Sequence, residues 1–212
     1  MRGERPILVG KSALVVVDIQ RGGALPSSVS GIPLMDGYEE LVGQAERIVA
    51  GAREAGIPVI FFQEAHRSNG VDFGRELDGA EGVHYLEGDE GTELWPTLRP
   101  GDGDYFIVKR RYSCFFGTEL DILLRGLRVT TLVLIGGLTD VCVHYTFADA
   151  HQHDYHVRVV EDCVIGSNEA RHRASLDAME YLQRGARRSA AEILEAFGTR
   201  RRSGSTEKTG VA

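Results

Sequence analysis

The chain has 212 residues, a formal net charge of −7 and 42% hydrophobic residues. That length suits a single domain with a buried core. The acidic balance argues against nucleic acid and anionic membranes as partners, because an acidic surface attracts neither. No apolar stretch approaches the roughly 20 residues that span a bilayer, and the first residues lack the apolar core of a signal peptide. We therefore expect a soluble, cytoplasmic protein.

Strand and helix patterns alternate along the chain. Five short apolar runs have the composition of strands that are buried on both faces. They lie at residues 13–18, 58–62, 105–108, 131–135 and 156–160. Apolar residues at helical spacing predict helices between and after these runs, the last over 190–197, where Ser189 and Glu192 have the spacing of a capping box. Residues 64–104 lack such periodicity and predict a long functional loop region.

The domain is expected to span residues 1–198, because residues 199–212 are polar and low in hydrophobic residues and predict a disordered tail. Repeated strand–helix units predict an α/β fold of three layers, with a mostly parallel sheet covered by helices on both sides. In such sheets, ligands bind beyond the carboxyl ends of the strands. Reactive residues that follow strands are therefore candidates for a functional site.

Three reactive side chains are predicted to meet at that edge. Asp18 ends the first strand, Lys109 ends the third, and Cys142 follows the fourth at the start of a helix. Each has an ordinary alternative role, as a helix cap, a solvated lysine or a small buried thiol. Their convergence is what points to catalysis.

The chemistry of these three residues is consistent with nucleophilic catalysis. A helix N-terminus and a neighbouring ammonium both favour a thiolate, so we expect a lowered pKa for Cys142. Asp18 can accept the thiol proton and return it to a leaving amine. The turn at residues 136–139 leaves backbone N–H groups free to hold an oxyanion. The other two cysteines, Cys114 and Cys163, are interpreted as structural, and the scattered set of three fits a reducing compartment.

Three segments resemble the signature segments of the isochorismatase-like cysteine hydrolases, in matching order and spacing. They are residues 13–20, 109–118 and 136–143. The likeness runs from about residue 10 to 197. This family includes nicotinamidases, N-carbamoylsarcosine amidases, ureidoacrylate hydrolases and biuret-type hydrolases. The resemblance implies a Rossmann-like, six-stranded parallel sheet flanked by helices, a small-molecule substrate, and a homo-oligomer, either a dimer or a tetramer.

The resemblance also implies roles for individual residues. Asp18, Lys109 and Cys142 match the catalytic triad of the family. A cis peptide is implied at Gly137–Leu138, with the N–H groups of Leu138 and Cys142 as the oxyanion hole. Together these residues imply hydrolysis of a C–N bond through a thioester.

No metal and no cofactor are expected. Nicotinamidases bind a metal through an Asp-x-His-x3-His segment after the second strand, whereas residues 64–70 of this chain hold a single histidine, His66. His84 lies in a segment that resembles one in relatives without a metal. His151 and His153 are two residues apart, and on a helix such residues face apart rather than forming a ligand pair.

The substrate is expected to be a small ureido or carbamoyl compound. True isochorismatases do not use a cysteine at the position of Cys142, which disfavours cleavage of a vinyl ether, and residues 71–79 look most like biuret and triuret hydrolases. Candidate substrate-binding residues are Gln20, Arg75 and Phe115. Their alternative roles are a loop brace, a solvated charge and core packing, respectively. Two other functions stay open: hydrolysis of a nicotinamide-like or isochorismate-like substrate, and a non-catalytic protein that keeps only the fold.

Overall fold

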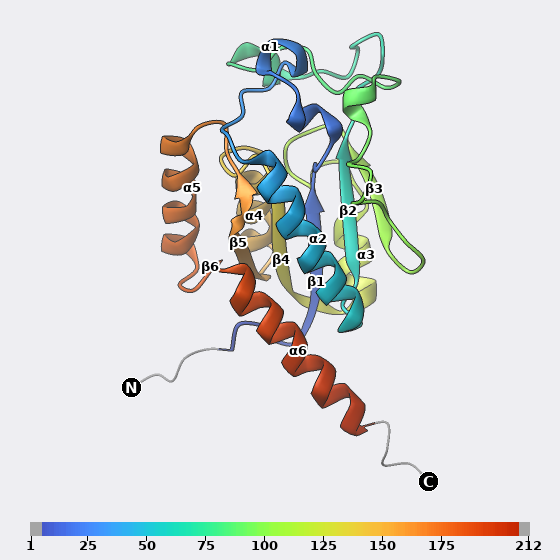
Figure 1. The fold of residues 1–212 in the computed structure, drawn as a ribbon, viewed down its shortest axis with the longest axis vertical. Helices are drawn as coiled ribbons and strands as arrows, with labels where there is room; N and C mark the ends of the chain where they lie inside the picture. Colours follow the sequence, from blue (N-terminus) through green and yellow to red (C-terminus); the bar gives the residue numbers. More distant parts are fainter. Residues whose placement is uncertain (1–5, 208–212) are drawn as a thin grey trace.

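Six parallel strands form one sheet, in the order β3-β2-β1-β4-β5-β6 (Figure 1). The structure is a computed structural model that describes residues 6–207, with side chains described through Arg200. The strands are β1 (Lys11–Val17), β2 (Val59–Glu64), β3 (Tyr105–Lys109), β4 (Val129–Gly137), β5 (His156–Ile165) and β6 (Arg187–Arg188). The expected α/β architecture with a six-stranded parallel sheet is therefore confirmed.

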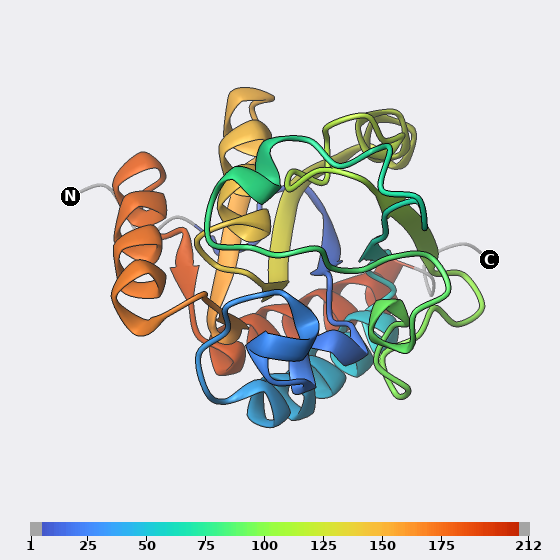
Figure 2. The same ribbon diagram turned by 90° about the horizontal axis from the view of Figure 1, so that it is seen from above.

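Helices cover both faces of the sheet (Figures 1 and 2). One face carries α2 (Tyr38–Glu54) and α6 (Ala190–Glu207), and the other carries α3 (Leu120–Leu127), α4 (Cys142–Gln152) and α5 (Glu169–Leu182). Short helical turns lie in the loops: η1 (Arg21–Ala24), α1 (Ser27–Ser30), η2 (Arg75–Asp78) and η3 (Glu90–Thr92). Among residues 6–207, none of the helices has the length and apolar character needed to cross a membrane.

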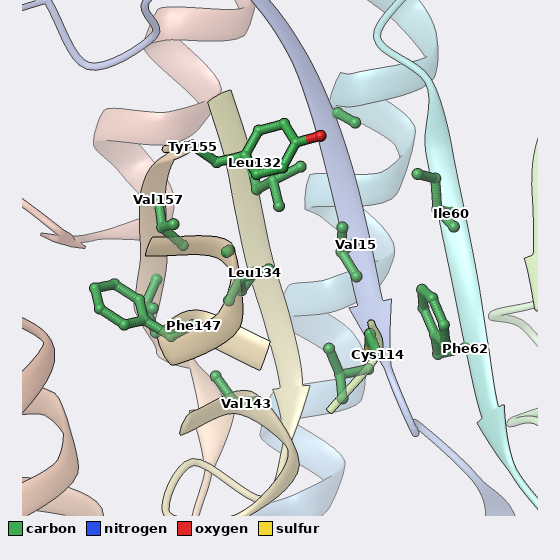
Figure 3. Packing of buried hydrophobic residues seen from close by; sticks show 14 of the residues in the cluster. Val15, Ile60, Phe62, Cys114, Leu132, Leu134, Val143, Phe147, Tyr155 and Val157 are labelled. Atoms are coloured by element: carbon green, nitrogen blue, oxygen red, sulfur yellow. The ribbon is translucent and has the colours of Figure 1, made fainter. Parts of the chain in front are cut away.

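The central strands are apolar throughout because both of their faces are buried. In β1, Ala13, Val15 and Val17 pack toward α3, α4 and α5, whereas Leu14 and Val16 pack toward α2 and α6. This alternation follows from the two-residue period of a strand. Figure 3 shows the first of these cores, where side chains of β1, β2, β4 and β5 meet those of α4. Packing on both faces fixes the position of each strand along its own axis. It therefore also fixes the position of any side chain at the carboxyl end of a strand.

Two features differ from the expectations. The sixth strand escaped detection because it consists of only two arginines, which pair with Val159 and Val160 of β5 through their backbone. Helix α6 extends from Ala190 to Glu207, beyond the predicted end at residue 197. The domain boundary at residue 198 stays a prediction. Residues 208–212 lie outside the described part of the chain, and there the predicted tail stays untested.

Interactions at the end of the predicted helix explain this extension. The Thr199 hydroxyl donates a hydrogen bond to the Glu195 carbonyl at 3.0 Å. Arg200 donates to the Ser12 hydroxyl at 2.8 Å and to the Gly10 carbonyl, and so ties α6 to the start of β1. The predicted capping box is confirmed, because the Ser189 N–H donates to Glu192 Oε2 at 2.8 Å and the Glu192 N–H donates to the Ser189 hydroxyl at 3.3 Å.

The carboxyl ends of the strands face a layer of loops (Figures 1 and 2). The long segment between β2 and β3 contains only the short turns η2 and η3, which confirms the predicted loop region. An isolated bridge from Gln20 to Leu94 attaches it to the loop after β1, and a second bridge, from His66 to Leu86, lies within the segment. The loops therefore cover the edge of the sheet at which the reactive residues were predicted to meet.

At that edge β1 and β4 approach each other very closely. Gly136 has a φ of +112°, and a Cβ atom there would lie 2.0 Å from the carbonyl oxygen of Val17. Only glycine fits such a contact. The next residue after Val17 is Asp18, which itself has a φ of 50°, a left-handed conformation that aspartate tolerates better than most residues. The backbone thus sets Asp18 directly beside the turn that leads to Cys142.

Candidate active site

The ammonium of Lys109 forms the centre of a buried cluster. Its Nζ lies 2.8 Å from Asp18 Oδ2, 2.6 Å from Glu64 Oε2 and 3.3 Å from Cys142 Sγ. Lys109 is 1% exposed, and all of its neighbours in the cluster are buried. The structure therefore brings together the three residues predicted to be catalytic, and it adds Glu64 to them.

Parallel strands place these side chains at one edge. Asp18 follows β1, while Glu64 and Lys109 are the last residues of β2 and β3 and are paired in register. Glu64 was not predicted as a site residue. The signal that identified Asp18 and Lys109, a charged residue closing a buried strand, applies equally to Glu64.

The charges in the cluster depend on one another. Burial raises the pKa of Asp18 to about 6, with Lys109 opposing the rise and Glu64 adding to it. Burial also opposes the ionisation of Glu64, but the charge of Lys109 and hydrogen bonds from two histidines hold the pKa of this carboxyl well below its usual value. At neutral pH both carboxylates are therefore ionised, and Asp18 is the stronger base of the two.

The thiol of Cys142 does not have the expected lowered pKa. Burial raises the pKa of Cys142 well above its ordinary value; the charge of Lys109 opposes this rise, and the charges of Glu64 and Asp18 add to it. The thiol donates a hydrogen bond to Glu64 Oε2 at 3.4 Å. The expectation of a resting thiolate is therefore wrong, because burial disfavours the charged form of the thiol. The thiol proton must leave for a base when the sulfur attacks.

The turn between β4 and α4 contains a cis peptide bond between Gly137 and Leu138, as the family resemblance implied. In this turn the N–H groups of Thr139, Val141 and Val143 donate to carbonyl oxygens. Within residues 6–207, the N–H groups of Leu138 and Cys142 have no acceptor. Two donors are therefore available beside the sulfur.

A small cavity opens onto Cys142. It combines the carboxylates of the cluster with aromatic and apolar walls. The lining residues include Asp18, Glu64, Glu81, His84, Tyr38, Tyr85, Tyr112, Leu34, Leu138 and Ile165. Of these residues, Glu81 and the three tyrosines were not predicted, since loop residues without periodicity give no signal for what they face.

Gln20 was a candidate for substrate binding, but its side chain is committed to the backbone. Its Nε2 donates to the carbonyl oxygens of Glu64 and Thr92 at 2.9 and 2.8 Å, and its Oε1 accepts from the Glu64 N–H at 2.9 Å. The side chain is fully buried and does not line the cavity. Gln20 instead braces the loop after β1 against the end of β2, which holds Asp18 and Glu64 in place.

The other two candidates for substrate binding also lie outside the cavity. The Arg75 side chain is 93% exposed and pairs with Asp78 at 2.5 Å. Phe115 packs against the core, and its ring stacks on His153 with a centroid distance of 5.3 Å. The structure thus assigns both residues the alternative roles considered for them, a solvated charge and core packing.

One group in the cluster has the composition of a metal site. Glu64, His66 and His84 present ligand atoms within 4.8 Å of one another, and Glu64 Oε1 lies 3.3 Å from Nε2 of each histidine. His84 belongs to the long loop, and it supplies the second histidine that the residues directly after His66 lack. The sequence after the second strand predicts one histidine at this position, whereas the structure brings two together.

One observation favours a hydrogen-bonded cluster over a metal site at these residues. The second oxygen of Glu64 pairs with Lys109 at 2.6 Å, so a divalent ion would lie close to a buried ammonium. These residues therefore fit a metal poorly, and no step of the reaction is assigned to one.

Comparisons with known proteins agree with this geometry. The isochorismatase domain matches residues 12–192. The ureidoacrylate amidohydrolase RutB of Methylobacterium radiotolerans is 34% identical over 186 residues, which cover 79% of this chain and 72% of the relative.

Solved structures show the same likeness. N-carbamoylsarcosine amidase from Thermoplasma acidophilum is 31% identical with a TM-score of 0.71, over 85% of this chain and 97% of the other. The pyrazinamidase of Pyrococcus horikoshii, solved in complex with zinc, is 26% identical with a TM-score of 0.73, over 85% and 99%. The domain match covers most of the chain, and the chain therefore belongs to the isochorismatase family.

Proposed function

We propose that the protein is a metal-independent cysteine amidohydrolase that cleaves the C–N bond of a small ureido or carbamoyl compound of the biuret type. The observation that carries this proposal is the position of the Cys142 thiol, 3.3 Å from Lys109 and on the wall of a cavity that Asp18 also lines. A nucleophile, a base and two free N–H donors converge there. That is the set of groups that acyl transfer requires.

The relatives support the reaction class. The names of ureidoacrylate amidohydrolase and N-carbamoylsarcosine amidase both describe hydrolysis of amide-type C–N bonds in ureido or carbamoyl compounds. The identities of 34% and 31% support the class of bond more strongly than the individual substrate.

In the first half of the reaction, Asp18 takes the thiol proton as Cys142 Sγ attacks the carbonyl carbon. A C–S bond forms, and the π electrons of the carbonyl move to its oxygen. We assign the stabilisation of this oxyanion to the N–H groups of Leu138 and Cys142. Protonated Asp18 then gives its proton to the leaving nitrogen, the C–N bond breaks, and ammonia departs from a thioester.

In the second half, Asp18 removes a proton from a water molecule that attacks the thioester carbon. The C–S bond breaks, the sulfur recovers a proton from Asp18, and the acid product leaves. Lys109 stays protonated throughout. Its charge compensates the thiolate character that develops on Cys142 and keeps Asp18 ionised between turnovers.

One observation favours an alternative substrate. Tyr38, Tyr85 and Tyr112 line the cavity, and aromatic walls also suit a flat ring such as that of nicotinamide. The complete set of reactive groups argues against a non-catalytic protein. The expected dimer or tetramer and the cytoplasmic location stay predictions.

Replacing the nucleophile should abolish turnover. In Cys142→Ala we expect kcat to fall at least about a thousandfold, because the two halves of the reaction both depend on the C–S bond. Cys163→Ala is the matched control, since Cys163 is equally buried but belongs to the core between the sheet and α2. Its kcat should stay within about twofold of wild type. Ammonia release is the readout and circular dichroism checks the fold; activity above a few per cent in folded Cys142→Ala contradicts nucleophilic catalysis.

The pH profile should report the burial of Asp18. The base must be ionised, and its pKa is raised to about 6. We therefore expect kcat/KM to be constant near neutral pH and to fall about tenfold per unit as the pH drops below about 6. Folding is followed by intrinsic fluorescence at each pH. A midpoint near 4, the ordinary value for an exposed aspartate, would show that Asp18 is not the base in this environment.

The ranking of substrates should favour ureides. We expect kcat/KM on biuret and triuret to exceed that on nicotinamide, because carboxylates in the cavity suit a flat molecule rich in N–H donors. Ammonia release is measured side by side on biuret, triuret, N-carbamoyl amino acids, ureidoacrylate-like acids and nicotinamide. A lead of tenfold or more for nicotinamide refutes the ureide assignment and leaves the cysteine mechanism intact.

Chelation should have no effect on the rate. Since Glu64 pairs with the buried ammonium of Lys109, dialysis against EDTA should leave kcat/KM within experimental error. Metal content of the purified protein, measured by mass spectrometry, should be far below one equivalent. A loss of activity that zinc or iron restores would overturn the metal-independent mechanism.

A further inference from the structure

The cavity is rich in carboxylates, and the basic side chains beside them are already paired: Nε2 of His84, which also lines the cavity, lies 3.3 Å from Glu64 Oε1. Asp18, Glu64 and Glu81 line it, and among the described residues its lining includes no arginine or lysine. The nearest ammonium is that of Lys109, which is shared between Asp18 and Glu64 at 2.8 and 2.6 Å. It offers one positive charge against two negative ones. A carboxylate on the substrate would thus meet repulsion without a compensating partner.

Glu81 is the carboxylate that the catalytic cluster does not use. It comes from the long loop between β2 and β3, and its Oε2 accepts a hydrogen bond from the Tyr112 hydroxyl at 2.8 Å. Tyr112 follows β3 and lines the same cavity. Within the described part of the chain, Glu81 pairs with no arginine or lysine. Its second oxygen is therefore available to a ligand.

The surroundings of Glu81 favour a ligand that brings hydrogen-bond donors. Burial raises the pKa of Glu81, and the charge of Glu64 adds to this effect against the hydrogen bond from Tyr112 and the charges of His84 and Lys109. Donated N–H groups or a positive charge on the ligand would offset this unfavourable desolvation.

Two arginines lie just outside the cavity. An open groove adjoins it, and Glu81 and Tyr112 line both. Arg75 and Arg171 line the groove but not the cavity, and Arg75 already pairs with Asp78. The Glu81–Tyr112 pair therefore stands between the nucleophile and these arginines.

We infer that Glu81, held by Tyr112, selects substrates whose end remote from the attacked carbonyl donates N–H groups and carries no negative charge. The inference rests on the proposed function, because it concerns the far end of the ureide that Cys142 attacks. The substrate class is thereby narrowed to neutral or cationic ureides, and short carbamoyl acids are excluded.

Three compounds test this selection, because they share a carbamoyl group and differ at the other end. Biuret is neutral there, N-carbamoylglycine is anionic, and carbamoylguanidine is cationic. In the wild type we expect kcat/KM for biuret or carbamoylguanidine to exceed that for N-carbamoylglycine at least a hundredfold. Glu81→Gln should shrink this ratio at least tenfold, or about 1.4 kcal/mol, and Tyr112→Phe should shrink it less. Glu90→Gln removes an equal charge from an exposed residue outside the cavity and should leave the ratio unchanged.

Binding to the Cys142→Ala variant separates the selection by Glu81 from the proposed hydrolase function. Calorimetry on this variant should show the same charge preference without turnover. If no compound is hydrolysed by the wild type but the preference in binding persists and depends on Glu81, the proposed function fails and the selection stands. Preference for N-carbamoylglycine, an unchanged ratio in Glu81→Gln, or absence of binding by all three compounds overturns the selection.

Discussion

A buried ammonium needs charged partners, and the whole site is arranged around that need. Removing a lysine from water costs several kcal/mol unless carboxylates surround it. For Lys109 the carboxylates come from β1 and β2, while the lysine itself closes β3. The cluster therefore forms only when three neighbouring strands are in register. The hydrophobic packing on both faces of the sheet supplies that register, and Gln20 ties the first two strand ends together through the backbone.

The same cluster affects the protonation state of the nucleophile. Burial, with the two carboxylates adding to its effect, leaves the thiol of Cys142 protonated at rest despite the neighbouring ammonium. A resting thiolate would be open to oxidation and alkylation, whereas a thiol that ionises only as it attacks is protected until a substrate arrives. Asp18 suits this task because burial brings its pKa close to the working pH while Lys109 keeps it ionised.

Much of the site could be predicted from the sequence because it depends on the ends of buried strands. Asp18 and Lys109 close apolar runs, and Cys142 begins the helix after another, so periodicity alone places them at one edge. The same rule applies to Glu64. Glu81 and Tyr112 could not be found in this way, since irregular loops carry no periodic signal. The protonation state of the thiol could not be predicted either, because it depends on burial and on neighbouring charges that only the three-dimensional arrangement reveals.

The glycine at the end of β4 has a consequence for mutational tolerance. Gly136 lets the backbone of β4 touch the carbonyl of Val17, one residue before the base. Substitutions in the rest of the cavity wall can change the substrate specificity without moving the reacting atoms. A methyl group at position 136 would instead push two whole strands apart. Variation in a population of such enzymes should therefore accumulate in the loops that roof the cavity, while this single backbone contact stays fixed.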